Sequence, residues 1–254
     1  MSALVAALFI GSRHGHKVTP MPAHNLAFTA MGAGLLWVGW FGFNAGSALG
    51  SNELASVALV NTNSAAAAAA LAWMLADRAR GGKTTLLSTA SGAVAGLVAV
   101  TPAAGFVAPW AALIIGAAGG ALCHAAVELK NRLGYDDALD VVGVHLVGGI
   151  AGALLTGVFA DPRINSAIPA LSLGASGGLI VEGSWALVGK QALAVVATML
   201  FCGLGTWGLL AAINVFTPLR ADEHEEHLGM DLSQHKERAY TLWHRPSPSV
   251  RQGH

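Results

Sequence analysis

The feature that most constrains this chain is a series of six apolar runs, each long enough or nearly long enough to cross a lipid bilayer. A spanning helix needs about 20 apolar residues. The runs are Leu26–Leu49, Leu54–Ala76, Thr84–Thr101, Val107–Leu129, Ala138–Ala160 and Lys190–Phe216, and the third is the shortest. We therefore expect an all-α fold, a polytopic membrane helical bundle with about six spanning helices.

The overall composition supports a membrane protein and excludes several other classes. Only 11% of the residues are charged and 54% are hydrophobic, whereas about 25% of the residues in soluble domains are charged. The net charge is zero and no basic run is present, which argues against nucleic-acid binding. The two cysteines offer no disulfide or zinc-site spacing. We predict no metal site and no cofactor.

The first residues, Met1–Ser12, are apolar but too short to cross the hydrocarbon layer at about 1.5 Å per residue. No basic residue precedes the apolar part, so the segment is unlike a signal peptide. We interpret it as the end of a helix whose beginning is absent. Residues 1–218 are expected to form the membrane domain, and the charged residues 219–254 a cytoplasmic tail that is helical at most in part.

The placement of lysine and arginine predicts the orientation. If the runs alternate in direction, twelve of these residues fall on one side and only Arg163 and Lys190 on the other. Because basic loops stay in the cytoplasm, the loop 13–24 and the C-terminal tail are expected there, in a multi-pass protein of the cell membrane.

Small residues recur every fourth position in several runs, as at Gly42, Gly46 and Gly50, or at Gly148 and Gly152. Such stripes allow helix backbones to approach closely in lipid. Most of the glycines are therefore expected to form packing surfaces in a tight bundle.

Five polar or aromatic residues within the runs form a candidate path. Trp40, Phe43 and Ser47 stand on one helical face, about 21, 25 and 31 Å from the inner end of their run. His145 lies about 10 Å from the inner end of its own run, and Asp140 is nearer that end. From outside to inside, the order is hydroxyl, phenyl, indole, imidazole and carboxylate, which suits a small cation.

The aromatic groups alone would not carry a charge across. A bare ion moved into an apolar medium faces tens of kcal/mol, roughly, by Born estimates, and a cation–π contact returns only about 0.5–2 kcal/mol. A solute that gives up a proton avoids most of this cost, and a neutral imidazole both accepts and donates hydrogen bonds.

Structural roles compete with functional ones for most of these groups. A lone histidine in a helix is more often structural, although a site inside the membrane favours function. His124 is expected to be packed, and Asn61, Thr62 and Asn63 to bond across helices. Asp136 and Asp137 precede the His145 helix, where carboxylates complement the helix dipole, so we expect both to cap it.

Several consecutive stretches resemble blocks of the ammonium transporter family (Amt, Mep and Rh proteins), in the family's order. They are HNLAFTAMGAGLLWVGWFGFNAGSAL, ALVNTNSAAAAAALAW, SGAVAGLVAVTPAAGFV, GYDDALDVVGVHLVGGIAGALLTGVFA and, in the tail, GMDLSQHKERAY. The resemblance implies an eleven-helix, trimeric pore for ammonium or ammonia, and a PII-type regulatory protein as a possible partner on the cytoplasmic face.

The resemblance also implies a role for each residue of the path. Ser47 would help receive ammonium at the outer vestibule, Phe43 would form part of a gate, and Trp40 would line the lumen. His145 would be the second of two paired pore histidines. Asp140 would sit at the inner mouth or hold structure.

Two departures from the family pattern matter. Leu146 follows His145 where the family usually has glycine, which places a bulkier side chain beside the histidine. The chain also resembles the family only from the end of its fifth helix onward, so the first pore histidine and its supporting aspartate have no counterpart. We expect that Met1 is an internal methionine of a longer chain or that the gene is truncated.

Two other functions remain open on the sequence alone. A non-conducting subunit or ammonium sensor would use the same residues without needing a complete pore. An intramembrane serine protease is a remote alternative, because GASGG around Ser176 resembles the nucleophile motif of rhomboid proteases. A serine nucleophile needs a histidine base, and the following run 190–216 contains none. We therefore do not expect an enzyme.

Overall fold

The six apolar runs all become helices in the computed structural model, which describes residues 1–172 and 174–238. The described residues form helices and turns without a β-strand, so the all-α expectation is confirmed. The elements are α1 (Ser2–Ile10), α2 (Leu26–Ala45), the 3-10 turn η1 (Gly46–Ala48), α3 (Glu53–Ala79), α4 (Leu86–Val100), α5 (Pro109–Leu133), the π-helical turn η2 (Val142–Leu146), α6 (Val147–Phe159), α7 (Ile168–Leu171), α8 (Leu179–Glu182), α9 (Ala186–Phe216), α10 (Glu223–Leu228) and the π-helical turn η3 (Asp231–His235).

Five of the helical segments are long and apolar enough to cross a membrane, and α4 is a shorter apolar helix. With 15 residues, α4 is about 22 Å long. It is also the most enclosed helix, since residues 95–100 are all buried. Helices α2, α3, α5 and α6 pack around it, so α4 does not need the length of a lipid-exposed span. The short third run is thus explained by its central position.

The close packing predicted from the small residues is seen where α3, α4, α5 and α6 meet. A methyl group added at Gly120 would lie 2.9 Å from the Cα of Ala69, and one at Gly152 would lie 3.0 Å from the Cα of Ala99. Backbones approach this closely only where one helix lacks a side chain. Close packing is not seen at Gly42 of α2, because a methyl group added there would meet no atom of another described segment within 4 Å.

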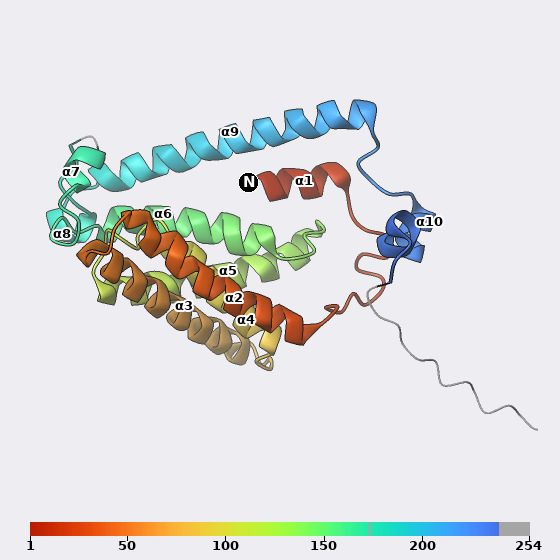
Figure 1. Ribbon diagram of the computed structural model, residues 1–254, viewed down its shortest axis with the longest axis horizontal. Helices are drawn as coiled ribbons and strands as arrows, with labels where there is room; N and C mark the ends of the chain where they lie inside the picture. Colours follow the sequence, from red (N-terminus) through yellow and green to blue (C-terminus); the bar gives the residue numbers. More distant parts are fainter. Residues whose placement is uncertain (173, 239–254) are drawn as a thin grey trace, which may run out of the picture.

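Helix α9 lies along one side of the bundle, with α1 beside it (Figure 1). Its 31 residues span about 46 Å, and only Leu187 and Gly203 are buried. Helix α1 has nine residues. The hydroxyl of Thr206 on α9 donates a hydrogen bond of 2.8 Å to the Ser2 hydroxyl on α1.

The molecule has two distinct ends, and we name the one formed by the loop after α1 and by α10 the charged end (Figure 1). The loop after α1 and helix α10 lie together at one end, and α7 and α8 lie at the other (Figure 1). Arg163 and Lys190, the two basic residues expected on the outer side, flank α7 and α8 in the sequence. The described part of the tail is helical at α10 and η3, and the rest of the predicted tail, 239–254, lies outside the described residues.

Candidate functional site

His145 sits in a π-helical turn rather than in an ordinary α-helical turn. Segment η2 covers residues 142–146 and continues directly into α6. A π-helical turn inserts one extra residue, which leaves backbone groups out of register, and such turns occur frequently at functional sites. The sequence did not predict this turn, because its apolar pattern is indistinguishable from that of a regular helix.

Side chains from neighbouring segments stabilise the turn. The Asp137 carboxylate accepts hydrogen bonds from the backbone N–H groups of Val141 (3.1 Å) and Val142 (2.7 Å). The thiol of Cys123 on α5 donates to the carbonyl oxygen of Val144 at 3.5 Å. The predicted capping role of Asp137 is therefore present in the structure. Asp137 fixes the start of the turn at Val141 and Val142, and Cys123 contacts Val144, the residue directly before His145.

The His145 ring is exposed and borders two cavities. One, of about 440 Å³, lies between α6, α9 and α1 and is also lined by Leu146 and Cys202. The other, of about 270 Å³, lies between α2, α4 and η2. The His145 ring thus lines two largely apolar spaces, one toward α9 and α1 and the other toward α2 and α4. Leu146, the residue that departs from the family pattern, faces the first of these spaces.

Helix α2 connects the second cavity to the aromatic residues predicted for the path. Residues at alternating steps of four and three share one helix face, and we name this face the α2 stripe: Thr29, Ala33, Leu36, Trp40, Phe43 and Ser47. The first three of these residues line the cavity beside His145. The face of α2 that borders the histidine therefore continues to Trp40 and Phe43, and Ser47 follows in the 3-10 turn η1.

The three residues at the far end of the α2 stripe differ in how firmly they are held. The Trp40 indole donates a 2.8 Å hydrogen bond to the Thr101 hydroxyl and meets the Phe43 ring edge-on at 6.2 Å. The Phe43 side chain is 63% exposed. The Ser47 hydroxyl donates to the Phe43 carbonyl oxygen at 2.6 Å, which leaves its oxygen lone pairs available as acceptors.

Buried amides join the helices behind the α2 stripe. The Asn44 amide donates to the Thr62 hydroxyl at 2.9 Å. The Asn61 amide donates to the carbonyl oxygens of Ala104 and Val107, both at 2.8 Å. The expected bonding across helices is seen for Thr62, which Asn44 of α2 contacts. Asn61 bonds instead to the turn between α4 and α5, and Asn63 lies on the exposed face of α3. Asn44 was not predicted, although an amide one turn from Trp40 in an apolar run was the available signal.

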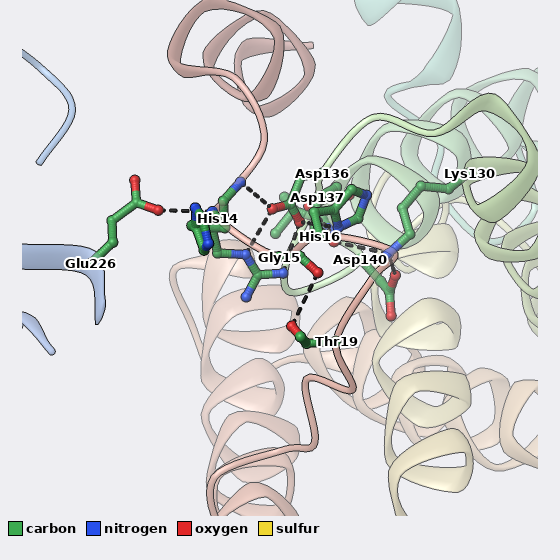
Figure 2. A network of polar contacts seen from close by, with 11 residues as sticks. His14, Gly15, His16, Thr19, Lys130, Asp136, Asp137, Asp140 and Glu226 are labelled. Carbon is green, nitrogen blue, oxygen red and sulfur yellow. Dashed lines mark hydrogen bonds and ion pairs between the residues drawn. The ribbon is translucent and has the colours of Figure 1, made fainter. Parts of the chain in front are cut away.

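Asp140 is engaged in an ion pair. Its carboxylate contacts the ammonium group of Lys130 on α5, and the same ammonium group donates to the Asp137 carbonyl oxygen at 2.9 Å (Figure 2). Asp140 also has a positive φ of 57°, which is uncommon outside glycine. Of the two roles predicted for Asp140, at the inner mouth or in holding structure, this geometry favours the structural one.

Asp136 does not cap the His145 helix, so that prediction is wrong. Its carboxylate accepts hydrogen bonds of 2.8 Å from Arg13 Nε and Nη2 and one of 2.9 Å from the Arg13 backbone, and it lies 3.5 Å from His16 (Figure 2). The side chain is 3% exposed. The Arg13 guanidinium lowers the pKa of Asp136 to about 2. The sequence could not reveal this pairing because its partners are 123 positions apart.

The remaining histidine of the bundle is packed, as expected. His124 is 6% exposed, its Nε2 atom lies 3.0 Å from the Asp77 carboxylate, and its ring meets Trp73 edge-on at 5.4 Å. Ser176, the residue behind the protease alternative, is exposed in the turn between α7 and α8.

Comparison with known proteins agrees with the geometry. The model of the Ammonium Transporter Family matches residues 1–240. An ammonium transporter of Bacillus subtilis is 46% identical over 241 residues, which are 94% of this chain and 57% of that protein. The chain therefore spans little more than half the length of this relative.

Solved structures show the same correspondence. The crystal structure of Saccharomyces cerevisiae Mep2 has a TM-score of 0.79 and 37% identity, covering 88% of this chain and 50% of the other. A structure described as a Sensor Amt Protein has a TM-score of 0.80 and 28% identity, covering 92% and 56%. The helices described above are thus arranged as in about half of each of these proteins.

Proposed function

The chain belongs to the ammonium transporter family, and on that premise we propose that it takes part in moving ammonium or ammonia across the cell membrane. The family is one of transporters rather than enzymes, and the chain is a multi-pass membrane protein. The permeation path, in this proposal, follows the α2 stripe inward from Ser47 to His145.

The single observation that carries the proposal is the position of His145. Its ring is exposed between two cavities, at a depth where an unpaired ionisable group needs a functional reason. A neutral imidazole offers one donor and one acceptor nitrogen. Ammonia passing the ring exchanges hydrogen bonds with it without the desolvation cost of a bare cation.

The outer end of the α2 stripe suits the charged form of the substrate. Ser47 offers hydroxyl lone pairs, and the exposed Phe43 ring offers a π-face to a small cation, worth about 0.5–2 kcal/mol. Ammonium is held there as a cation and passes His145 as ammonia. Asp140 and Lys130 stabilise the inner end of the η2 segment rather than contact the substrate.

The same proposal covers assembly and topology. Residues 1–218 form the membrane domain, and residues 219–254 form a tail on the cytoplasmic side. The chain works as a homotrimer, with a PII-type protein docking on the cytoplasmic face. The positive-inside distribution of basic residues supports the orientation, and family membership supports the assembly.

A non-conducting subunit or ammonium sensor is the second candidate function. It is favoured by the similarity to the Sensor Amt Protein and by the exposure of His145 and Phe43, because a sensor needs a binding position rather than a continuous path.

Uptake of labelled methylammonium separates the two functions. The full chain and its His145→Ala variant are expressed in a strain without its own ammonium transporters, and membrane levels are matched by immunoblot. Transport predicts uptake by the parent chain and its loss in the variant. The matched control is His224→Ala, which removes an exposed histidine from α10 and is expected to leave uptake unchanged. A folded, membrane-inserted chain without uptake contradicts transport and supports the sensor.

A further inference from the structure

The sequence predicted no metal site, yet the structure brings two histidines and one glutamate together at the charged end. His14, in the loop after α1, lies beside Glu223 and His227 of α10. Their candidate ligand atoms all lie within 4.8 Å of one another. The sequence could not predict that these three residues meet, because the two segments are far apart in the chain. His14 and Glu226 of α10, for example, are 212 positions apart.

The side chains converge from both segments. His14 Nδ1 lies 3.1 Å from the Glu223 carboxylate, and the His14 and His227 rings are 4.3 Å apart with their planes tilted by 57°. Glu223 and His227 are four residues apart on α10, so they share one helix face. One carboxylate therefore faces two imidazoles.

The backbones on both sides are fixed by contacts outside the cluster. Glu226 accepts the backbone N–H of His14 at 2.8 Å and pairs with Arg220 at 2.8 Å (Figure 2 shows the first contact). The Arg220 guanidinium and the His14 N–H hold the pKa of Glu226 below its usual value. Asp222 caps the first turn of α10 by accepting the backbone N–H of Glu225 at 2.8 Å. The loop and helix are thus pre-positioned before any ion binds.

We propose that His14, Glu223 and His227 bind one divalent transition-metal ion of the Zn²⁺ class, which links the loop after α1 to the tail helix. Two imidazoles and one carboxylate form a ligand set known for Zn²⁺, with an open position for water. Tetrahedral ligands at about 2.0–2.2 Å from zinc lie about 3.4 Å from one another. The His14–Glu223 distance of 3.1 Å is close to this value, and the His227 ligand atom lies within 4.8 Å of both others.

The ligand chemistry selects against the common alkaline-earth ions. Mg²⁺ and Ca²⁺ prefer oxygen ligands, whereas imidazole suits Zn²⁺, Ni²⁺ and Cu²⁺. All three residues are exposed, so an ion reaches them without opening the membrane domain. The ion is a bound cross-link at the end of the protein and not a transported solute, so the inference does not depend on the proposed transport function.

The first test measures Zn²⁺ affinity of the full chain, purified in detergent without a histidine tag, by competition with a chromogenic chelator. One equivalent is expected to bind. Loss of an outer-shell partner costs about 10–100-fold in metal affinity, so His14→Ala, Glu223→Gln and His227→Ala are each expected to lower the affinity at least tenfold. His224→Ala on the same helix is the matched control and keeps the parent affinity, and Mg²⁺ does not compete.

The second test asks whether the ion bridges the two segments. Hydrogen exchange of the α10 amides is followed with and without Zn²⁺, and Zn²⁺ is expected to slow this exchange in the parent chain but not in His14→Ala. Size-exclusion profiles confirm that each variant is folded. The proposal is overturned if the parent chain binds no equivalent of Zn²⁺, or if His14→Ala binds it as tightly as the parent, since the ion would then rest on α10 alone.

Discussion

Replacing Gly152 by alanine tests whether close helix contact, rather than side-chain interdigitation, holds α6 against α4. The added Cβ would contact the Ala99 carbonyl oxygen and lie 2.8 Å from its carbonyl carbon and 3.0 Å from its Cα. All three are backbone atoms of a buried helix, so no side-chain rotation relieves the overlap. Overpacking costs about 1–3 kcal/mol, and this site belongs at the upper end.

Alanine also gains helix propensity over glycine, by about 0.8–1.0 kcal/mol. The net destabilisation expected for Gly152→Ala is therefore about 2 kcal/mol. For a chain of this size, 1 kcal/mol shifts the unfolding midpoint by about 2–4 °C, so the midpoint should fall by about 4–8 °C. Gly149→Ala is the matched control on the same helix, because a Cβ there meets nothing within 4 Å.

The assay is a thermal scan in detergent with a thiol-reactive fluorogenic dye. Cys123 is fully buried in α5 and reports unfolding when it becomes accessible, and replacing Cys202 by serine removes the second thiol. All variants are scanned at one rate, since irreversible unfolding depends on the scan rate. Equal midpoints for Gly152→Ala and Gly149→Ala would refute the close-contact argument.

Three further predictions follow from the polar contacts. Asn61→Ala leaves two buried carbonyl oxygens without their donor and should destabilise the chain by about 2–4 kcal/mol. Asn63→Ala, at an exposed position of the same helix, should change the thermal unfolding midpoint little. Similar losses of stability in both variants would contradict the role of the Asn61 hydrogen bonds. Asp137→Ala removes a cap worth about 1 kcal/mol and should speed hydrogen exchange at the first residues of η2, and unchanged exchange there would count against the capping role. The pKa of Asp136 is lowered from 3.8 to about 2 by Arg13, so the stability from this pair is present above pH 3.8 and is lost as the pH falls toward 2. The thermal unfolding midpoint of Asp136→Asn should accordingly lie below that of the parent chain near neutral pH, and this difference should disappear in acid. A difference that does not change with pH would contradict the pairing of Asp136 with Arg13.

The contacts at the charged end lie in one continuous series. Glu226 of the tail holds His14, the adjacent Arg13 holds Asp136, and the next residue, Asp137, caps the turn that carries His145.

The sequence by itself determined the apolar helices and the helix face of α2 on which candidate residues lie. The apolar runs set the helices to within a few residues, because lipid-facing segments need continuous apolar length. Helical spacing alone placed Trp40, Phe43 and Ser47 on one face, and the same periodicity extends this face to the cavity beside His145. These properties are local, so they can be read from neighbouring residues.

Only the tertiary structure decided which distant groups meet. The pairing of Asp136 with Arg13 and the convergence of His14 with α10 join segments far apart in the chain. The π-helical turn at His145 is local, but Cys123 of α5 contacts it at the Val144 carbonyl oxygen. Apolar periodicity carries no information about such pairings, because a charged residue near a helix end is equally compatible with capping, ion pairing and metal binding. Packing of the helices selects one of these outcomes by fixing which side chains lie within hydrogen-bond reach.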